Sequence, residues 1–139
     1  MGGRIVIDER LAQVPLFAAC SKRELAGISR LMTEITVEAG KVLAEQGHLG
    51  NEFIVILEGR ATVSRGGRTI RTLGPGDHFG EIALLDDDHR RTATVVADTD
   101  MEIAVLSRRE FGQLLDEHPA TCRRLLVGLA RIVADQYDT

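Results

Sequence analysis

The chain has 139 residues, of which 44% are hydrophobic and 27% charged, and its net charge is −4. This length suits one domain with a hydrophobic core, so we expect a single domain over residues 1–139. The sequence shows no secretory signal, and no apolar run approaches the length of a membrane span, about 18 residues. We therefore expect a cytoplasmic chain without membrane contact. The acidic balance and the few aromatic residues argue against direct nucleic-acid binding.

The N-terminal part shows helical patterns. Residues 8–20 are weakly helical and turn around Pro15, because proline cannot lie inside a regular helix. Ser21 and Glu24 have the spacing of a capping box, and apolar residues follow at helical intervals. A short amphipathic helix is therefore expected from Ser21 to about Leu31.

From Thr33 onward the apolar period changes to two, and glycines interrupt the apolar runs. Gly66-Gly67 is typical of a tight turn between two strands. Short strands are predicted at residues 33–38, 42–43, 53–57, 61–65, 68–73, 92–97 and 101–106. This succession predicts a mainly β fold, an antiparallel β-barrel or jelly roll, with N-terminal helices and two C-terminal helices against it.

Two helices are predicted after the last strand. Ser107 with Glu110 again has the form of a capping box, and His118-Pro119 ends the first of these helices. The second is expected over Ala120–Tyr137, and its apolar stripe is wider than one contact needs. Two interpretations stay open: one broad core face, or a second face that binds a partner such as another copy of the chain.

Residues 74–95 carry the most informative pattern. A glycine-rich approach ends at Gly80, a short helical turn begins near Glu81, and Arg91 opens the next strand-like run. Unpaired N–H groups at the start of the turn, Arg91 and the hydroxyl of Thr92 all suit a phosphate. A carboxylate beside a phosphate is repulsive unless it accepts hydrogen bonds from neutral hydroxyls, such as those of ribose. Glu81 therefore indicates a nucleotide of low charge, such as a cyclic phosphodiester.

This stretch resembles the phosphate-binding cassette of cyclic-nucleotide-binding domains. The resemblance rests on Phe79-Gly80-Glu81-Ile82-Ala83-Leu84-Leu85, followed by Arg91-Thr92-Ala93-Thr94-Val95, and it extends over roughly Leu11 to Tyr137. The family includes the regulatory subunits of cAMP-dependent protein kinase, the bacterial catabolite activator and cyclic-nucleotide-gated channels. The resemblance implies a sensor that binds cAMP, or else cGMP, and whose C-terminal helices move on binding. It also implies that the chain is not an enzyme and needs no cofactor.

The resemblance assigns the phosphate to one arginine and its neighbours. Arg91 is expected to hold the cyclic phosphate, together with the backbone N–H groups of Ile82 and Ala83 and the hydroxyl of Thr92. Many family members have Pro-Arg at this place, whereas this sequence has a second arginine, Arg90, directly before Arg91. Arg91 is favoured because Thr-Ala-Thr-Val follows it, and Arg90 is expected to face solvent or the acidic run before it.

The resemblance also assigns the ribose and the base. Glu81 and the backbone of Gly80 are expected to bind the ribose 2′-OH. The base is expected to be lined by two residues of the strands and capped by a residue of the last helix: Val63, Ile70, and either Arg131 or Tyr137. In the family, a threonine at the position of Thr92 can favour cGMP, but a threonine there also occurs in domains that bind cAMP. We expect the ligand to be cAMP.

Other functions fit the residues less well. A domain that has lost its ligand and serves in dimerisation remains an alternative. So does a regulatory fragment of a larger transcription regulator or enzyme, because the chain leaves no room for an effector, whose identity is unknown. A metal enzyme is not favoured, since the four histidines have no metal-ligand spacing. We therefore expect no catalytic residues and no metal.

Overall fold

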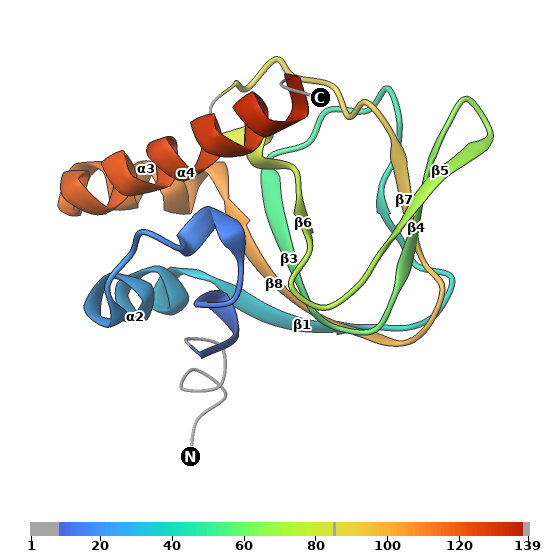
Figure 1. The fold of residues 1–139 in the computed structure, drawn as a ribbon. Helices are drawn as coiled ribbons and strands as arrows, with labels where there is room; N and C mark the ends of the chain where they lie inside the picture. The colour runs from blue at the N-terminus through green and yellow to red at the C-terminus, as the bar shows by residue number, and fades with distance from the viewer. Residues whose placement is uncertain (1–8, 85, 138–139) are drawn as a thin grey trace. The chain divides into compact units, whose positions relative to one another are not determined.

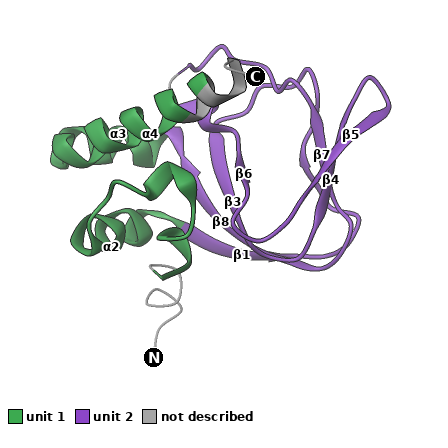
Figure 2. Ribbon diagram, viewed as in Figure 1, with its two compact units in different colours: residues 1–32, 109–139 green, residues 33–108 purple. Residues whose placement is uncertain are grey.

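The computed structural model describes residues 9–84 and 86–137, without the side chains of 132, 133 and 135–137 (Figure 1). The chain divides into two compact units (Figure 2). The helical unit contains Met1–Met32 and Arg109–Thr139, and the β unit contains Thr33–Arg108. The single domain expected over residues 1–139 stays a prediction.

The β unit contains two four-stranded antiparallel sheets. The first has the order β1-β8-β3-β6 and consists of Thr33–Val37, Met101–Ser107, Glu52–Glu58 and His78–Phe79. The second has the order β2-β7-β4-β5 and consists of Val42–Ala44, Thr94–Ala97, Ala61–Arg65 and Arg68–Leu73. A short 3-10 helix, η2 (Glu81–Leu84), follows β6. The expected mainly β fold is confirmed as a jelly-roll-like pair of sheets, because the described strands do not close into one barrel.

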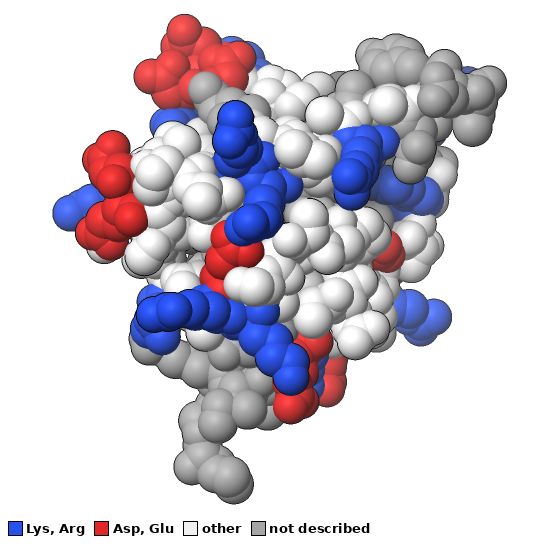
Figure 3. Space-filling view, turned by 60° about the vertical axis from the view of Figure 1, so that its left-hand side comes forward, with Lys and Arg blue, Asp and Glu red and all other residues white. Residues whose placement is uncertain are grey.

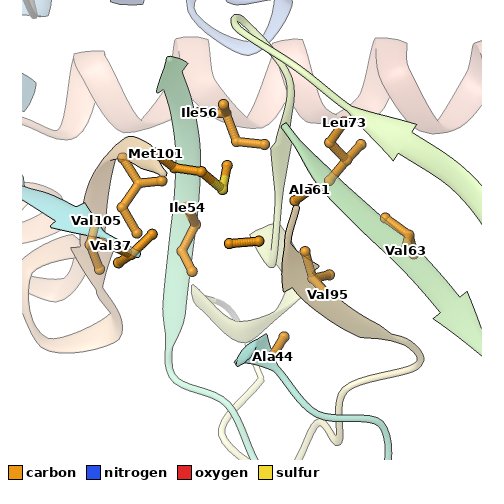
Figure 4. Packing of buried hydrophobic residues seen from close by; sticks show 12 residues of the cluster. Val37, Ala44, Ile54, Ile56, Ala61, Val63, Leu73, Val95, Met101 and Val105 are labelled. Carbon is orange, nitrogen blue, oxygen red and sulfur yellow. The ribbon is translucent and has the colours of Figure 1, made fainter. Parts of the chain in front are cut away.

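Apolar side chains from both sheets form one core (Figure 4). The strands β4 and β7 contribute alternate residues, as expected when one face of a sheet is buried. By contrast, the middle of β3 is buried at every position, which explains its uninterrupted apolar run. The core residues are Val37, Ala44, Ile54, Ile56, Ala61, Val63, Leu73, Val95, Ala97, Met101, Ile103 and Val105.

The strand expected at 92–97 begins later, at Thr94. The carbonyl of Thr92 accepts a hydrogen bond from Nε of Arg65 at 3.0 Å, so a side chain takes the place of a strand partner there. The hydroxyl of Thr94 accepts a hydrogen bond from the N–H of Gln46 at 3.0 Å. Side-chain bonds of this kind are invisible to a search for apolar periodicity, which is why the boundary was placed two residues too early.

The helical unit contains a 3-10 turn, η1 (Pro15–Phe17), and the helices α2 (Lys22–Leu31), most of α3 (Arg108–Glu117) and α4 (Pro119–Tyr137). The predicted capping box is confirmed, because Oγ of Ser21 accepts from the N–H of Glu24 and the carboxylate of Glu24 accepts from the N–H of Ser21. The last helix begins at Pro119, one residue earlier than expected, since proline is well tolerated at the first helical position. Within the described part of the chain, no helix combines the length and apolarity needed to cross a membrane.

Glu24 also connects α2 to α4. Its largely buried carboxylate accepts hydrogen bonds from Oγ1 of Thr121, at 3.2 Å, and from Nη1 of Arg124. The hydrogen bond from the backbone of Ser21 is the main cause that lowers the pKa of Glu24, and Thr121 and Arg124 lower it further against the effect of burial. The pKa of Glu24 is thus lower in the folded chain than in the unfolded chain. The carboxylate therefore stabilises the fold at a pH above its pKa in the unfolded chain. This stabilisation is lost as the pH falls through its pKa in the folded chain.

We therefore predict that Glu24→Gln lowers the free energy of unfolding at neutral pH by about 1 kcal/mol. Glutamine keeps an acceptor for the cap but lacks the charge, so the loss reports the charge-dependent part of the bonds to Ser21, Thr121 and Arg124. The difference between wild type and variant should shrink when urea unfolding is repeated below about pH 4, where a glutamate is protonated in the unfolded chain. Glu34→Gln, at an exposed position of β1, is the control. An equal loss at both pH values would contradict this account.

Candidate functional site

Arg91 is held by the backbone of the β unit. Its Nη2 donates a hydrogen bond to the carbonyl of Glu52, at the start of β3, over 3.0 Å. The guanidinium lies against two glycines: a Cβ at Gly80 would be 2.6 Å from Nη1, and a Cβ at Gly50 would overlap Nε and Cζ. Gly80 also has φ +87°, in the left-handed region that favours glycine. The two glycines and the Glu52 carbonyl therefore fix the guanidinium independently of any ligand.

The charge of Arg91 is available for an anion. Burial lowers the pKa of Arg91, while the carboxylates of Glu52 and Glu81 oppose that effect. Arginine has so high an intrinsic pKa that it remains protonated at neutral pH in spite of this shift. A guanidinium has five N–H donors, so Arg91 can bind a phosphate while it keeps its bond to Glu52.

Glu81 begins η2 and faces His78 of β6. Its Oε2 lies 3.7 Å from Nδ1 of His78, and the two side chains are only 26% and 11% exposed. This separation is too long for a hydrogen bond, and neither atom has a hydrogen-bond partner among the described residues. A buried carboxylate oxygen without a donor fits a ligand that brings a hydroxyl group.

The Glu81 carboxylate is charged at neutral pH. Burial acts to raise the pKa of Glu81, but the interaction with His78, the residue's own backbone N–H and the charge of Arg71 together outweigh it. The pKa of Glu81 therefore lies below the usual range of a glutamate. An ionised carboxylate is a hydrogen-bond acceptor only, so this position selects a neutral donor such as a hydroxyl.

The backbone of η2 differs from the expectation of unpaired N–H groups. The N–H of Ala83 donates to the carbonyl of Gly80 at 3.1 Å, because a 3-10 turn closes its hydrogen bonds over three residues. The carbonyl of Ala83 accepts from Nε of Arg108 at 2.8 Å. A phosphate at this turn must therefore share or displace the bond of Ala83, while the side chain of Ile82 is exposed.

The other predicted residues differ in their exposure. Val63 is only 8% exposed in the core, whereas Ile70 is 46% exposed on β5. Thr92 is exposed, and Arg90 donates to the carbonyl of Gly47 at 2.9 Å rather than to the acidic run. Arg131 is exposed on α4, and the side chain of Tyr137 lies outside the described residues.

Four residues at the site escaped sequence reasoning: Gly50, Glu52, Arg71 and His78. Glu52 contributes a carbonyl, which every residue has, so no pattern could single it out. Gly50 belongs to a loop in which the sequence indicates only turns. Arg71 is on β5, ten residues before Glu81, and lowers the pKa of Glu81 through its charge. His78 directly precedes the cassette, but the histidines were considered only in arguing against a metal site.

The face of the molecule in Figure 3 shows the described lysine and arginine side chains in separate groups. Acidic and uncharged side chains lie between these groups. That nucleic acid is not a direct partner stays a prediction from composition.

Comparison with known proteins identifies the family. The family model described as "Cyclic nucleotide-binding domain" matches residues 34–118. The chain belongs to the cyclic nucleotide-binding domain family. The match contains the whole cassette, including Gly80, Glu81 and Arg91, and confirms the resemblance predicted from those residues.

Three proteins illustrate what this cyclic nucleotide-binding domain is similar to. A cAMP-dependent protein kinase regulatory subunit of Schizosaccharomyces pombe is 33% identical over 113 residues, which cover 81% of this chain and 27% of that protein. A cyclic nucleotide-binding domain from Methylobacillus flagellatus has a TM-score of 0.84 at 26% identity, covering 99% of this chain and 81% of the other. The catabolite activator protein of Thermus thermophilus has a TM-score of 0.76 at 31% identity, over 88% and 59%. The chain spans about a quarter of the length of the kinase regulatory subunit.

Proposed function

We propose that the chain binds a cyclic nucleotide, with cAMP preferred to cGMP, and that it acts as a regulatory module and not as an enzyme. The observation that carries the proposal is the arrangement around Gly80. A backbone-fixed guanidinium, Arg91, lies against Gly80, and a charged carboxylate oxygen without a described hydrogen-bond donor, Glu81, follows it. The preference for cAMP rests on the relatives, which include cAMP-dependent protein kinase regulatory subunits.

The two charged side chains suit two adjacent groups of a cyclic nucleotide, its cyclic phosphate and its ribose 2′-hydroxyl. A cyclic phosphodiester carries one negative charge, which the guanidinium of Arg91 can bind through paired N–H groups. The adjacent ribose carries a 2′-hydroxyl, a neutral donor for the oxygen of Glu81. A terminal phosphate has a larger negative charge and would be repelled by that carboxylate, so a linear nucleotide fits less well.

Displacement of a fluorescent cyclic nucleotide by unlabelled cAMP, cGMP and 5′-AMP tests this function. We expect cAMP to compete best and cGMP less well. We expect 5′-AMP to compete at least about tenfold worse than cAMP, because the extra negative charge of its terminal phosphate beside Glu81 costs about 1.4 kcal/mol or more. Equal competition by 5′-AMP would contradict recognition of the cyclic phosphate. Failure of the wild type to bind either cyclic nucleotide would favour the alternative, a ligand-free dimerisation module.

Gly50→Ala should weaken cAMP binding about tenfold or more while leaving the fold intact. The added Cβ overlaps Nε and Cζ of Arg91, so the guanidinium must leave its bond to Glu52, a charge-assisted bond worth roughly 1.5–3 kcal/mol. Gly74→Ala is the matched control, because the described atoms leave open space around its Cβ. Calorimetric titration with cAMP checks the affinities and circular dichroism checks the fold. Equal affinities for the two variants would contradict the role of Gly50.

We further propose that the ligand signal reaches the C-terminal helices through Arg108. This residue is the last of the β unit and the first of α3. Its guanidinium donates to the carbonyl of Ala83 at 2.8 Å and to the carbonyl of Gly50 at 3.1 Å. A ligand that moves η2 therefore acts on the residue from which α3 starts.

Arg108→Lys should uncouple the helices from the ligand, because lysine cannot bind both carbonyls through one planar fork. We expect cAMP to slow amide hydrogen exchange in α3 and α4 of the wild type, and to do so at most about half as much in the variant. Arg109→Lys, at an exposed neighbouring position, is the control. The same cAMP-dependent protection in the Arg108 variant as in the wild type would remove Arg108 from the relay.

The last helix also supports a proposal about partners. Leu126 and Val127 of α4 are exposed apolar side chains, which favours a homodimer through Ala120–Tyr137. Sedimentation of wild type and of Leu126→Asp should show loss of the dimer in the variant. Because the chain spans only about a quarter of the related kinase regulatory subunit, an effector outside this sequence also remains a proposal.

A further inference from the structure

The loop between β2 and β3 holds the backbone of Arg91. Arg91 lies outside the sheet, because β7 begins only at Thr94. The N–H of Arg91 donates to the carbonyl of His48 at 2.8 Å, and the carbonyl of Arg91 accepts from the N–H of Gly47 at 2.8 Å. Gly50, in the same loop, lies against the guanidinium. The position of this loop therefore determines the position of both the backbone and the side chain of Arg91.

Gln46 fastens the start of this loop to two other segments. Its backbone N–H donates to Oγ1 of Thr94 at 3.0 Å. Its side-chain Oε1 accepts from the N–H of Gly66 at 2.9 Å, in the turn between β4 and β5 (Figure 1). Because β7 lies between β2 and β4 in the sheet, no strand pairing joins β2 to that turn. The side chain of Gln46 is therefore a direct connection between the loop and the turn.

Arg65 completes a closed ring of contacts around Arg91. It directly precedes Gly66 in the chain, and its Nε donates to the carbonyl of Thr92 at 3.0 Å. The ring runs from Gln46 to the β4–β5 turn, from the turn to Thr92, and from Arg91 back to the loop. Each member of a ring is held from two sides, so the loss of one bond loosens its neighbours as well.

We propose that Gln46 is a positioning residue for Arg91, which acts through the loop and not through contact with the ligand. This inference rests on the proposed function, because it makes Arg91 the group that binds the phosphate. The part of the side chain that carries the role is Oε1, which keeps the loop against the β4–β5 turn. A guanidinium that is fixed before the ligand arrives loses less freedom on binding, so the affinity is higher.

Calorimetric titration with cAMP compares the wild type with two variants of Gln46. Methionine keeps the length of the side chain without the acceptor, whereas glutamate keeps an acceptor for the N–H of Gly66. We expect Gln46→Met to weaken binding about three- to tenfold, the range for loss of one neutral hydrogen bond. Gln46→Glu should stay within about twofold of the wild type at about 0.15 M salt, which screens an exposed charge. Gln113→Met, at an exposed position of α3, is the matched control and should leave the affinity unchanged.

Two further measurements separate the positioning of Arg91 from a general loosening of the fold. In an Arg91→Lys background, Gln46→Met should change the affinity less than about twofold, because no guanidinium is left to position. In the ligand-free protein, Gln46→Met should make the N–H of Arg91 exchange with solvent at least about threefold faster. The amides of α3 should exchange as in the wild type.

The outcomes distinguish this inference from the proposed function. If Gln46→Met binds cAMP as tightly as the wild type, or loses as much affinity in the Arg91→Lys background, the inference fails although the binding function stands. An equal loss in Gln46→Glu would also overturn it, because that variant keeps the acceptor. If the wild type does not bind cAMP, the proposed function fails, and unchanged exchange at the N–H of Arg91 in Gln46→Met would show that Gln46 does not hold that residue.

Discussion

Arg91→Lys is expected to weaken cAMP binding by about a hundredfold. The guanidinium can bind the phosphate through paired N–H groups while it donates to the carbonyl of Glu52, whereas a lysine ammonium acts as a single charge and has no planar fork. Loss of one charge-assisted bond of this kind costs roughly 1.5–3 kcal/mol. Calorimetric titration of both proteins with cAMP measures the loss directly.

Arg90→Lys is the control for this prediction, because Arg90 directly precedes Arg91 and donates to the carbonyl of Gly47. Its effect on affinity should stay within about threefold, in keeping with an exposed side chain. If the Arg90 variant lost more affinity than the Arg91 variant, the phosphate would bind to Arg90. That result would move the anion site away from Gly80.

Glu81→Ala is expected to abolish discrimination between cAMP and 2′-deoxy-cAMP. The wild type should prefer cAMP by about ten- to a hundredfold, since a hydrogen bond from a hydroxyl to a charged carboxylate contributes roughly 1.5–3 kcal/mol. In the variant neither ligand finds this acceptor, so the ratio of the two affinities should approach one. The four affinities form a double-mutant cycle that isolates the contact between Glu81 and the hydroxyl.

The pH dependence of this preference follows from the state of Glu81. The pKa of Glu81 is below the usual range, because His78, the residue's own backbone N–H and Arg71 outweigh the effect of burial. The carboxylate therefore remains ionised, and the preference for the 2′-hydroxyl should persist, down to about pH 5. Loss of the preference between pH 7 and pH 5 would contradict the lowered pKa.

Much of the fold was predictable because local chemistry and global fold agree. The capping box of Ser21 and Glu24 marks the start of α2, and Gly66-Gly67 marks the turn between β4 and β5. Alternating polar and apolar residues identify strands such as β4. Periodicity does not show whether strands close into one barrel or form two sheets, since that depends on pairing between residues far apart in sequence.

The site was predictable only where the cassette is continuous in sequence. Gly80, Glu81 and Arg91 stand out by their residue types, and the structure places Arg91 against Gly80. The carbonyl that holds Arg91 comes from Glu52, 39 residues away, and its identity depends on the backbone alone. Val63 shows the same limit, because alternation indicates that one face is buried but not whether a given residue meets the core or a ligand.

Calorimetric titration of the wild type with cAMP tests the central claim most directly. The claim is that the fixed guanidinium of Arg91 and the open carboxylate oxygen of Glu81 form a cyclic-nucleotide site. It predicts saturable binding of one cAMP per chain with a Kd below about 100 μM, equivalent to at least about 5.5 kcal/mol of binding free energy. Absence of saturable binding by the folded wild type at millimolar cAMP would contradict it.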